Sequence, residues 1–206
     1  TVIFNGSTPQ AIGGSNATVF NNLSNTNLTA LLTANNNITV KNSLNINSAS
    51  VLNLGTFALI DGGSFSDAGT GHIYTANTSS TPIPAGKTWN SVLRYSNTTG
   101  GQTIVAGTYN GSPSLELDNT SGTQTASGNI VTGGQLNINN GGTPIFDMNG
   151  FNLTTNALNV IAPNSVIDMR GGTLNYTSVL SMDGTVRFSG ATNGLPFASG
   201  TVEYYG

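Results

Sequence analysis

The chain has 206 residues, only 6% of them charged, with a formal net charge of −3, 29 Asn, 29 Thr, 27 Gly and no Cys. Disulfides and thiolate metal sites are therefore excluded, and five scattered basic residues exclude the basic stripe that nucleic-acid binding needs. No apolar run approaches the roughly 18 residues of a membrane helix, so we expect no membrane insertion. Asn, Thr and Gly are poor helix formers, and apolar and polar residues alternate regularly, so we expect an all-β chain.

The N-terminal half contains short strand-like phrases that return at nearly constant spacing. One series of apolar residues 21 positions apart is Val2, Leu23, Leu44 and Phe65, and Leu52 and Ile73 belong to another. The spacing slips after this, in the stretch TANTSSTPIPAGKTWN. Since Pro82 and Pro84 cannot donate hydrogen bonds to a central ladder, we expect a loop or irregular coil over residues 75–90.

The C-terminal half repeats more clearly. Triplets of the form apolar-x-apolar begin 21 or 22 residues apart, at Leu93, Leu115, Leu136, Leu158, Leu180 and Val202. Two further series step by 21 residues, namely Phe146, Ile167 and Phe188, and Leu153, Leu174 and Leu195. Because alternate side chains of a strand face opposite sides, we expect the first and third residues of each triplet to point inward and the middle residue to face solvent.

Three strand signals in every repeat predict a right-handed parallel β-helix, that is, a β-solenoid with about 21–22 residues and three short strands per coil. At about 4.8 Å per coil, some nine coils would form a single rod. Asn149-Gly150 and Arg170-Gly171-Gly172 fit corners that need positive φ. Asn137 and Asn159 should stack on adjacent coils and hydrogen-bond along the rod, as in cross-β ladders.

A larger repeat overlays the coils. Residues 43–59 resemble residues 135–153, and the opening phrase at 1–14 resembles 91–107. We therefore expect residues 1–206 to be a single solenoid segment of a longer array, with module boundaries near 90 and 184–200. Neighbouring modules of the same chain would then be its first partners, because open coil ends aggregate unless they are covered.

The phrases GTVEYYG, VIFNGSTPQAIGG…FNNL and LNINSASVLNLG resemble the low-charge Asn/Thr/Gly repeats of very large secreted proteins of Bacteroidetes. Those proteins are often cargo of the type IX secretion system and include adhesin-like surface proteins. The resemblance covers most of the chain in style and phrase, without a catalytic motif. It implies an extracellular or cell-surface location, a solenoid fold and a structural or adhesive role.

Asp147 and Asp168 are the best candidates for a chemical site. They are 21 residues apart, so they should lie on adjacent coils about 5 Å from each other. Such a pair could bind Ca²⁺ or act as an acid–base pair. The alternative is that both are solvated residues before a corner, screened by Arg170. No other cofactor is expected.

A Ser-His-Asp catalytic arrangement would have to use the single histidine, His72, but the sequence contains no nucleophile motif for it. Tyr95 and Tyr204 fall on the inward phase, which favours core packing, whereas Trp89 and Tyr205 fall outside it and could stack against sugars. Five basic residues spread over several coils give no acidic and basic cluster of the kind that polysaccharide lyases need, so we expect no enzyme.

These observations favour a structural or adhesive segment of a stalk, fibre or adhesin. A carbohydrate-binding or carbohydrate-cleaving β-helix domain is the first alternative, and a protein that assembles filaments end to end is the second. Surface glycans and further copies of the chain are accordingly the expected partners outside the array.

Overall fold

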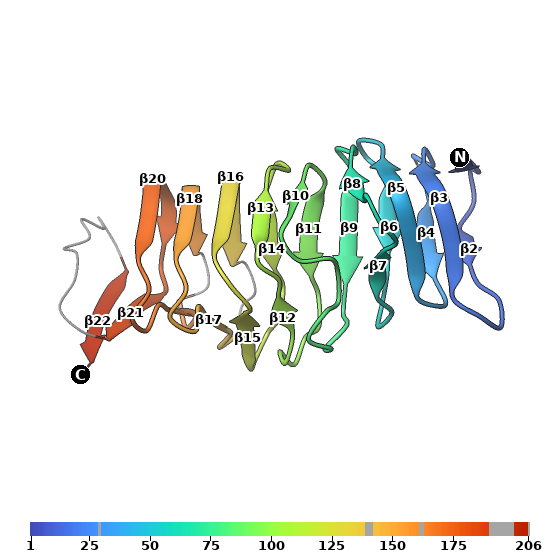
Figure 1. Cartoon of the computed structure of the whole chain (residues 1–206). Coiled ribbons are helices and arrows are strands. Elements are labelled where there is room, and N and C mark those ends of the chain that lie inside the picture. Colours follow the sequence, from blue (N-terminus) through green and yellow to red (C-terminus); the bar gives the residue numbers. More distant parts are fainter. Residues whose placement is uncertain (29, 139–141, 161–162, 190–199, 206) are drawn as a thin grey trace.

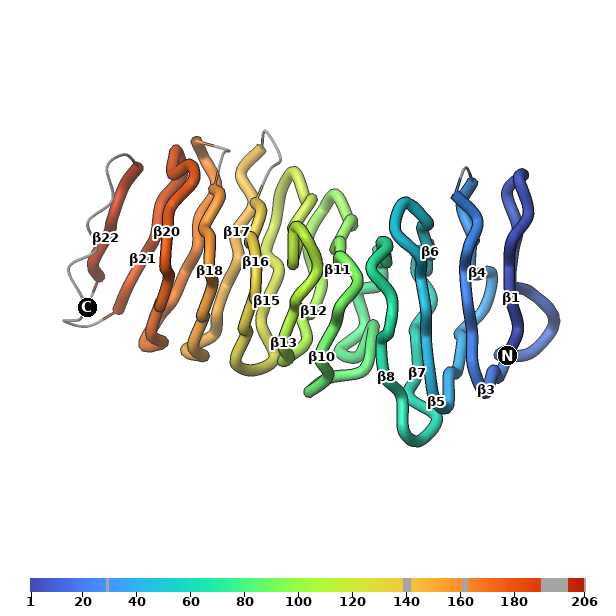
Figure 2. Tube along the Cα trace, turned by 90° about the horizontal axis from the view of Figure 1, so that it is seen from above, coloured from blue at the N-terminus to red at the C-terminus, as the bar shows by residue number. Residues whose placement is uncertain are grey.

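A computed structural model shows an elongated solenoid whose two termini lie at opposite ends (Figure 1). It describes residues 1–28, 30–138, 142–160, 163–189 and 200–205. In these residues there is no helix, strands pair in parallel and about nine turns stack along one axis (Figure 2). The expected all-β parallel β-helix is therefore confirmed. The described part of the chain contains no helix that could cross a membrane.

The strands form three sheets. Sheet A contains β1 (Val2–Phe4), β3 (Thr18–Asn25), β5 (Ile38–Ile46), β7 (Leu59–Asp61) and β8 (Ser66–Asp67). Sheet B contains β2 (Gln10–Ile12), β4 (Leu31–Ala34), β6 (Val51–Asn53), β9 (His72–Thr75), β10 (Lys87–Trp89), β11 (Val92–Tyr95), β13 (Gly107–Tyr109), β14 (Leu115–Leu117), β16 (Ile130–Ile138), β18 (Leu153–Val160) and β20 (Leu174–Met182). Sheet C contains β12 (Thr103–Ile104), β15 (Thr123–Ala126), β17 (Ile145–Asp147), β19 (Val166–Asp168), β21 (Thr185–Ser189) and β22 (Thr201–Tyr205).

The rod has three long faces, which do not coincide with the three sheets. The reason is that some long strands turn a corner, so that their two halves lie on different faces. The register shifts between Phe20 and Asn22 in β3, and between Thr132 and Gln135 in β16. The first face holds the N-terminal halves of β3 and β5, then β7, then all of sheet C. The second holds β1, the C-terminal halves of β3 and β5, β8, β10, β13 and the N-terminal halves of β16, β18 and β20. The third holds the remaining strands and runs from β2 to β20.

The interior is a stack of apolar side chains in register. Leu93, Leu115, Leu136 and Leu158 occupy successive coils of the third face, each directly opposite the next, and all four are fully buried. Four members of the predicted interior series are thus confirmed. Each buried leucine contributes roughly 2 kcal/mol of transfer free energy.

The last two members of that series were predicted wrongly. Leu158 lies opposite Val179, the next pair is Asn159 with Ser181, and this β-bulge leaves Leu180 60% exposed. A bulge inserts one unpaired residue, and in the apolar pair Val179-Leu180 the sequence does not tell which residue points inward. Val202 lies on the first face, opposite Val186.

Variable coil length explains the other departures. Phe146 lies opposite Ile167, as predicted, but Val186 rather than Phe188 follows. Val2, Leu23 and Leu44 are in register, as predicted, but Asp67 rather than Phe65 comes next. The pairs Leu52 with Ile73 and Leu153 with Leu174 are confirmed, and Leu195 lies outside the described residues.

The first face is interrupted where the prolines lie. Residues 76–86 form no strand, while β10 occupies the end of the range expected to be irregular. Leu59 N–H still donates to Pro82 O at 3.0 Å, and Ile83 remains buried in the core. Pro84 has no N–H to continue the ladder, which accounts for the separation of sheet A from sheet C. The module boundaries near 90 and 184–200 stay a prediction.

Corners and polar ladders follow the expected chemistry. Asn149, Gly150 and Arg170 have φ values of 53°, 82° and 48°, so the predicted positive φ is confirmed at these three residues. The prediction is wrong for Gly171 and Gly172, whose φ lies outside the left-handed region. Asn159 Nδ2 donates to Asn137 Oδ1 at 3.1 Å, which confirms the predicted Asn ladder, although both side chains are buried and do not face solvent as expected. Comparable interior rungs, Gln124 to Gln102 at 3.1 Å and Thr132 to Thr155 at 2.7 Å, keep buried polar groups hydrogen-bonded.

Two buried tyrosines make the rod sensitive to alkali. Burial raises the pKa of Tyr95 to about 12 and the pKa of Tyr109 well above its ordinary value. Tyr109 Oη donates to Val105 O at 2.5 Å, and Val105 N–H donates to Tyr95 Oη at 3.3 Å. The folded state therefore keeps these protons where the unfolded chain has lost them, so the free energy of unfolding falls as pH rises above about 10.

We expect an alkaline absorbance titration of the folded protein to contain a late ionisation step that belongs to Tyr95 and Tyr109. Tyr95 should ionise only at about pH 12, and Tyr109 should also ionise well above the ordinary pKa of a tyrosine, together with the loss of β-sheet circular dichroism. In concentrated urea all six tyrosines should titrate together near 10. A native titration in which every tyrosine ionises near 10 while the fold persists would contradict the buried placement.

Candidate functional site

Charged side chains gather on the first face at the C-terminal end of the rod. In sheet C, Asp147 lies opposite Asp168, Asp168 opposite Arg187, and Arg187 opposite Glu203. We call these four residues, together with Arg170, the charged column. It holds three of the eight acidic and two of the five basic residues of the chain, so the expected absence of an acidic and basic cluster was wrong, and the column is the strongest candidate for a site.

The innermost member of the charged column is an ion pair between coils. Arg170 Nε donates to Asp147 Oδ1 at 2.8 Å and Nη2 to Asp147 Oδ2 at 2.6 Å, while Asn149 N–H also donates to Oδ1 at 2.7 Å. Asp147 is nearly buried. The hydrogen bonds to Asp147 raise the pKa of Arg170. A two-pronged guanidinium contact of this kind is strong and geometrically specific.

The outer members are bridged in turn. Asp168 Oδ1 accepts hydrogen bonds from Arg170 N–H at 3.1 Å and from Tyr205 Oη at 2.6 Å. The bond to Asp168 raises the pKa of Tyr205, because it stabilises the protonated phenol beside an anion. Arg187 Nε contacts Glu203 Oε2. Arg170 and Arg187 thus offset the like-charge repulsion that the stacked carboxylates Asp147 and Asp168 would otherwise suffer.

The predicted stacking of Asp147 and Asp168 on adjacent coils is confirmed. Their calcium site stays a prediction, as does their acid–base role. A cation there would have to displace Arg170 from Asp147, and the described residues hold no group of three or more His, Cys, Asp or Glu side chains suited to a metal ion. A surface hollow of about 500 Å³ beside the column is lined by Asp168, Arg170, Arg187, Glu203 and Tyr205.

Calcium should therefore leave the stability of the protein unchanged. We expect the same melting temperature in excess EDTA and in millimolar CaCl₂, because the Arg170 guanidinium already neutralises Asp147. Differential scanning calorimetry would measure this, with MgCl₂ at equal ionic strength as the control for screening. A rise specific to calcium that disappears in Asp168→Asn would favour the calcium site instead.

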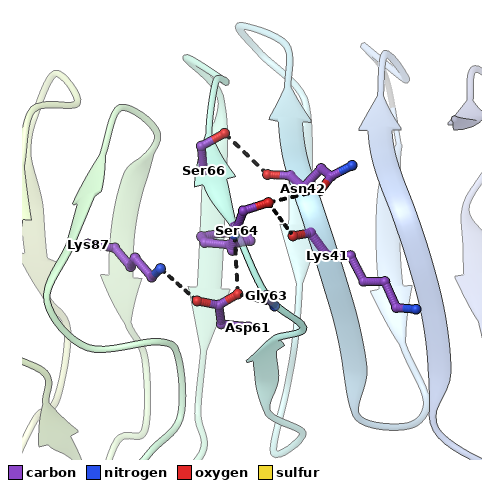
Figure 3. A network of polar contacts seen from close by, with 8 residues as sticks. Lys41, Asn42, Asp61, Gly63, Ser64, Ser66 and Lys87 are labelled. Atoms are coloured by element: carbon purple, nitrogen blue, oxygen red, sulfur yellow. Dashed lines mark hydrogen bonds and ion pairs between the residues drawn. The ribbon is translucent and has the colours of Figure 1, made fainter.

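A second polar network lies near the break in the first face (Figure 3). Lys87 Nζ lies 2.6 Å from Asp61 Oδ2, and Gly63 N–H donates to Asp61 Oδ1 at 2.8 Å. The bond with Lys87 holds the pKa of Asp61 below its usual value. Ser64 Oγ donates to Asn42 Oδ1 at 3.0 Å on the preceding coil. Beside the ion pair is a hollow of about 270 Å³ with an apolar lining that includes Leu59, Ile60, Ile83 and Pro84.

The third polar cluster lies at mid-rod on the third face. Arg94 forms an ion pair with Asp118 and places its guanidinium 5.2 Å from the centre of the Tyr74 ring. His72 meets the same ring edge-to-face at 6.0 Å. The Tyr74 ring is therefore engaged by two side chains of its own rod. We interpret the contact between Arg94 and Tyr74 as a cation–π interaction that links two coils, and not as a sugar-binding surface.

Two of the four aromatic predictions are wrong. Tyr95 is fully buried, as predicted, and Tyr205 lies outside the core, as predicted. Tyr204, expected inside, is 54% exposed because it belongs to the last described strand. Trp89, expected outside, is fully buried and packs against Phe65 at 5.4 Å. The irregular stretch 76–86 resets the inward phase just before Trp89.

Sequence reasoning missed Asp67, the most buried carboxylate. Its two oxygens accept hydrogen bonds from Gly69 N–H, Asn90 N–H, Ser91 N–H and Ser91 Oγ at 2.7 to 3.0 Å. Burial raises its pKa despite these donors. The short phrase Asp67-Ala-Gly69 was the available signal, because Asp before a turn often accepts a backbone N–H two residues on. Asp67 ties the corner after β8 to the corner after β10.

Comparison of the chain with protein-family models, with curated proteins and with solved structures found no match. In the three clusters, the described charged groups are engaged mainly with one another across neighbouring coils. Each ion pair connects residues 16 to 26 positions apart in the sequence. The ion pairs therefore link neighbouring coils to one another.

Proposed function

We propose that this chain is a non-enzymatic, structural segment of an extracellular stalk, fibre or adhesin. One observation supports the proposal most: the ladder on the third face continues without a gap from β2 through β4, β6, β9, β11, β14, β16 and β18 to β20. Backbone hydrogen bonds parallel to the axis resist bending and leave few segments open to proteases.

The composition supports the same role. Neutral Asn, Thr and Ser side chains avoid stacking like charges one coil apart, and cross-coil bonds such as Asn42 to Asn21 at 3.1 Å turn these side chains into further ladders. A rod made in this way needs no disulfide. The extracellular location rests on the phrases that resemble secreted Bacteroidetes repeats.

A test of this role combines three measurements on the isolated chain. We expect resistance to broad-specificity proteases without any ligand, no saturable binding on a glycan array, and no release of products from a panel of polysaccharides. Saturable binding abolished by Lys87→Ala would instead favour the carbohydrate-binding alternative, located at the hollow beside Asp61. Turnover of a polysaccharide would overturn the structural role.

A further inference from the structure

Two of the three backbone ladders are interrupted at the same level of the rod. On the first face the ladder ends at β7 and resumes at β12. On the second face it ends at β8 and resumes at β10. Only the third face continues past this level, where β9 and β11 lie side by side (Figure 1) and pair over four residues. All of residues 59–104 are described, so within this stretch the third face carries the one unbroken ladder.

The first interruption follows from the prolines. Leu59 N–H donates to Pro82 O at 3.0 Å. In a parallel ladder the next bond would join Leu59 O to the N–H of residue 84, but Pro84 has no N–H. Further along, Gly86 N–H donates to Ala106 O at 2.7 Å, on the following coil. Among the described residues, a single backbone hydrogen bond therefore connects β7 to the proline-containing segment.

On the second face the side chain of Asp67 takes the place of the ladder. Its Oδ2 accepts hydrogen bonds from Asn90 N–H at 2.8 Å and from Ser91 N–H at 2.7 Å, and Asn90 Nδ2 donates to Asp67 O at 2.8 Å. The described strands β8 and β10 do not pair with each other. Hydrogen bonds to a charged group are stronger than neutral ones, so Asp67 is the main polar connection between β8 and β10.

The other contacts across the interruption are also made by side chains. Lys87 reaches from β10 to Asp61 at the end of β7 (Figure 3), with 2.6 Å between Nζ and Oδ2. Phe65 packs against Trp89, with 5.4 Å between the ring centres. A partly exposed ion pair contributes little to stability, and the hollow of about 270 Å³ beside it leaves room for movement. Because Asp61 ends β7 and Phe65 precedes β8, these contacts lie near the edge where the first and second faces meet, opposite the third face.

We propose that the rod has a hinge at this level, formed by β9 and β11 of the third face, and that Asp67 holds the opposite edge closed. When the bonds of Asp67 break, β8 separates from β10 while the ladder of the third face stays intact. The stretches before and after the hinge have ladders on all three faces and move as stiff bodies. Regions held by fewer backbone hydrogen bonds open at a lower free-energy cost than a fully paired core. The inference rests on the structural role proposed above and gives the rod one defined bending point.

Distances between pairs of spin labels test the hinge. The chain has no cysteine, so the labels attach only to introduced cysteines. Ser66, Thr88 and Thr154 are exposed on the second face. The pair Ser66→Cys with Thr154→Cys spans the hinge, whereas Thr88→Cys with Thr154→Cys lies on its C-terminal side and is the matched control. We expect double electron–electron resonance to show an additional population at longer distances for the first pair only.

Asp67→Ala should enlarge that population, because it removes the acceptor of Asn90 N–H and Ser91 N–H. The control pair of labels should keep its distance distribution in the same variant. Asp183→Ala removes an exposed carboxylate near the C-terminal end of the described rod and should leave both distributions unchanged. Circular dichroism shows whether each variant is folded.

Hydrogen exchange measured by NMR on the unmodified chain tests the hinge without any variant. Ser91 N–H donates to Asp67, whereas Val92 N–H, the next along the chain, donates to Gly71 O at 2.8 Å on the third face. Opening of the hinge frees the first of these N–H groups and leaves the second bonded. We expect Asn90 and Ser91 to exchange at least about tenfold faster than Val92.

Two results would overturn the hinge. One is a folded Asp67→Ala variant in which the hinge-spanning labels show no population at longer distances, and the other is equally slow exchange at Ser91 and Val92. Either result, in a chain that resists proteases and binds no glycan, would remove the hinge and leave the structural role standing. Turnover of a polysaccharide by a chain that bends as expected would do the reverse.

Discussion

Gly172→Ala should be among the most destabilising small substitutions in the chain. A Cβ at this position would lie 2.0 Å from Phe151 O and 2.8 Å from the Phe151 carbonyl carbon. These are backbone atoms of the preceding coil, so they cannot rotate away, and the two coils would have to separate at this corner. We expect a loss of about 3 kcal/mol in the free energy of unfolding, the upper part of the usual range for overpacking.

The neighbouring glycine provides the control. A Cβ at Gly171 would meet no atom within 4 Å, and its φ lies outside the left-handed region. Gly171→Ala should therefore change stability by less than about 0.5 kcal/mol, as surface substitutions usually do. Urea unfolding followed by circular dichroism compares the two variants. Equal midpoints would show that the corner at Phe151 is looser than described.

The number of residues per coil could be predicted because every coil must place apolar residues in the same interior, which restricts the positions where they can occur. A slip of one residue would turn every interior side chain of a strand to solvent, so the leucines from Leu93 to Leu158 had to recur at nearly constant spacing. The same logic placed Asp147 beside Asp168. These features repeat over several coils, so chance variation at one position does not hide them.

The remaining features depend on single coils, and a period cannot reveal them. Arg187 and Glu203 complete the charged column through steps of 19 and 16 residues, shorter than the spacing that defined the repeat. Trp89 follows an irregular stretch that resets the phase. Screening by Arg170, the alternative expected from the sequence, is confirmed for Asp147, but Asp147 is buried rather than solvated, and the two-pronged contact depends on a corner residue with φ of 48°.

The contrast between Leu136 and Leu180 tests the register most directly, because both leucines belong to the same predicted series. Leu136 is fully buried between Leu115 and Leu158, and Leu136→Ala should cost about 3 kcal/mol through lost burial and the cavity left behind. Leu180 is extruded by the bulge, so Leu180→Ala should cost less than about 0.5 kcal/mol.

Urea denaturation of both variants, followed by circular dichroism, gives the two free energies under identical conditions. The expected order follows from the register alone, since the chemical change is the same in both variants. The stability of a solenoid is approximately the sum of the stabilities of its coils and of the interfaces between neighbouring coils. Leu136→Ala should therefore also weaken the coils on either side and lower the cooperativity of the unfolding transition. If Leu180→Ala proved as costly as Leu136→Ala, Leu180 would point inward and the bulge beside Val179 would be wrong.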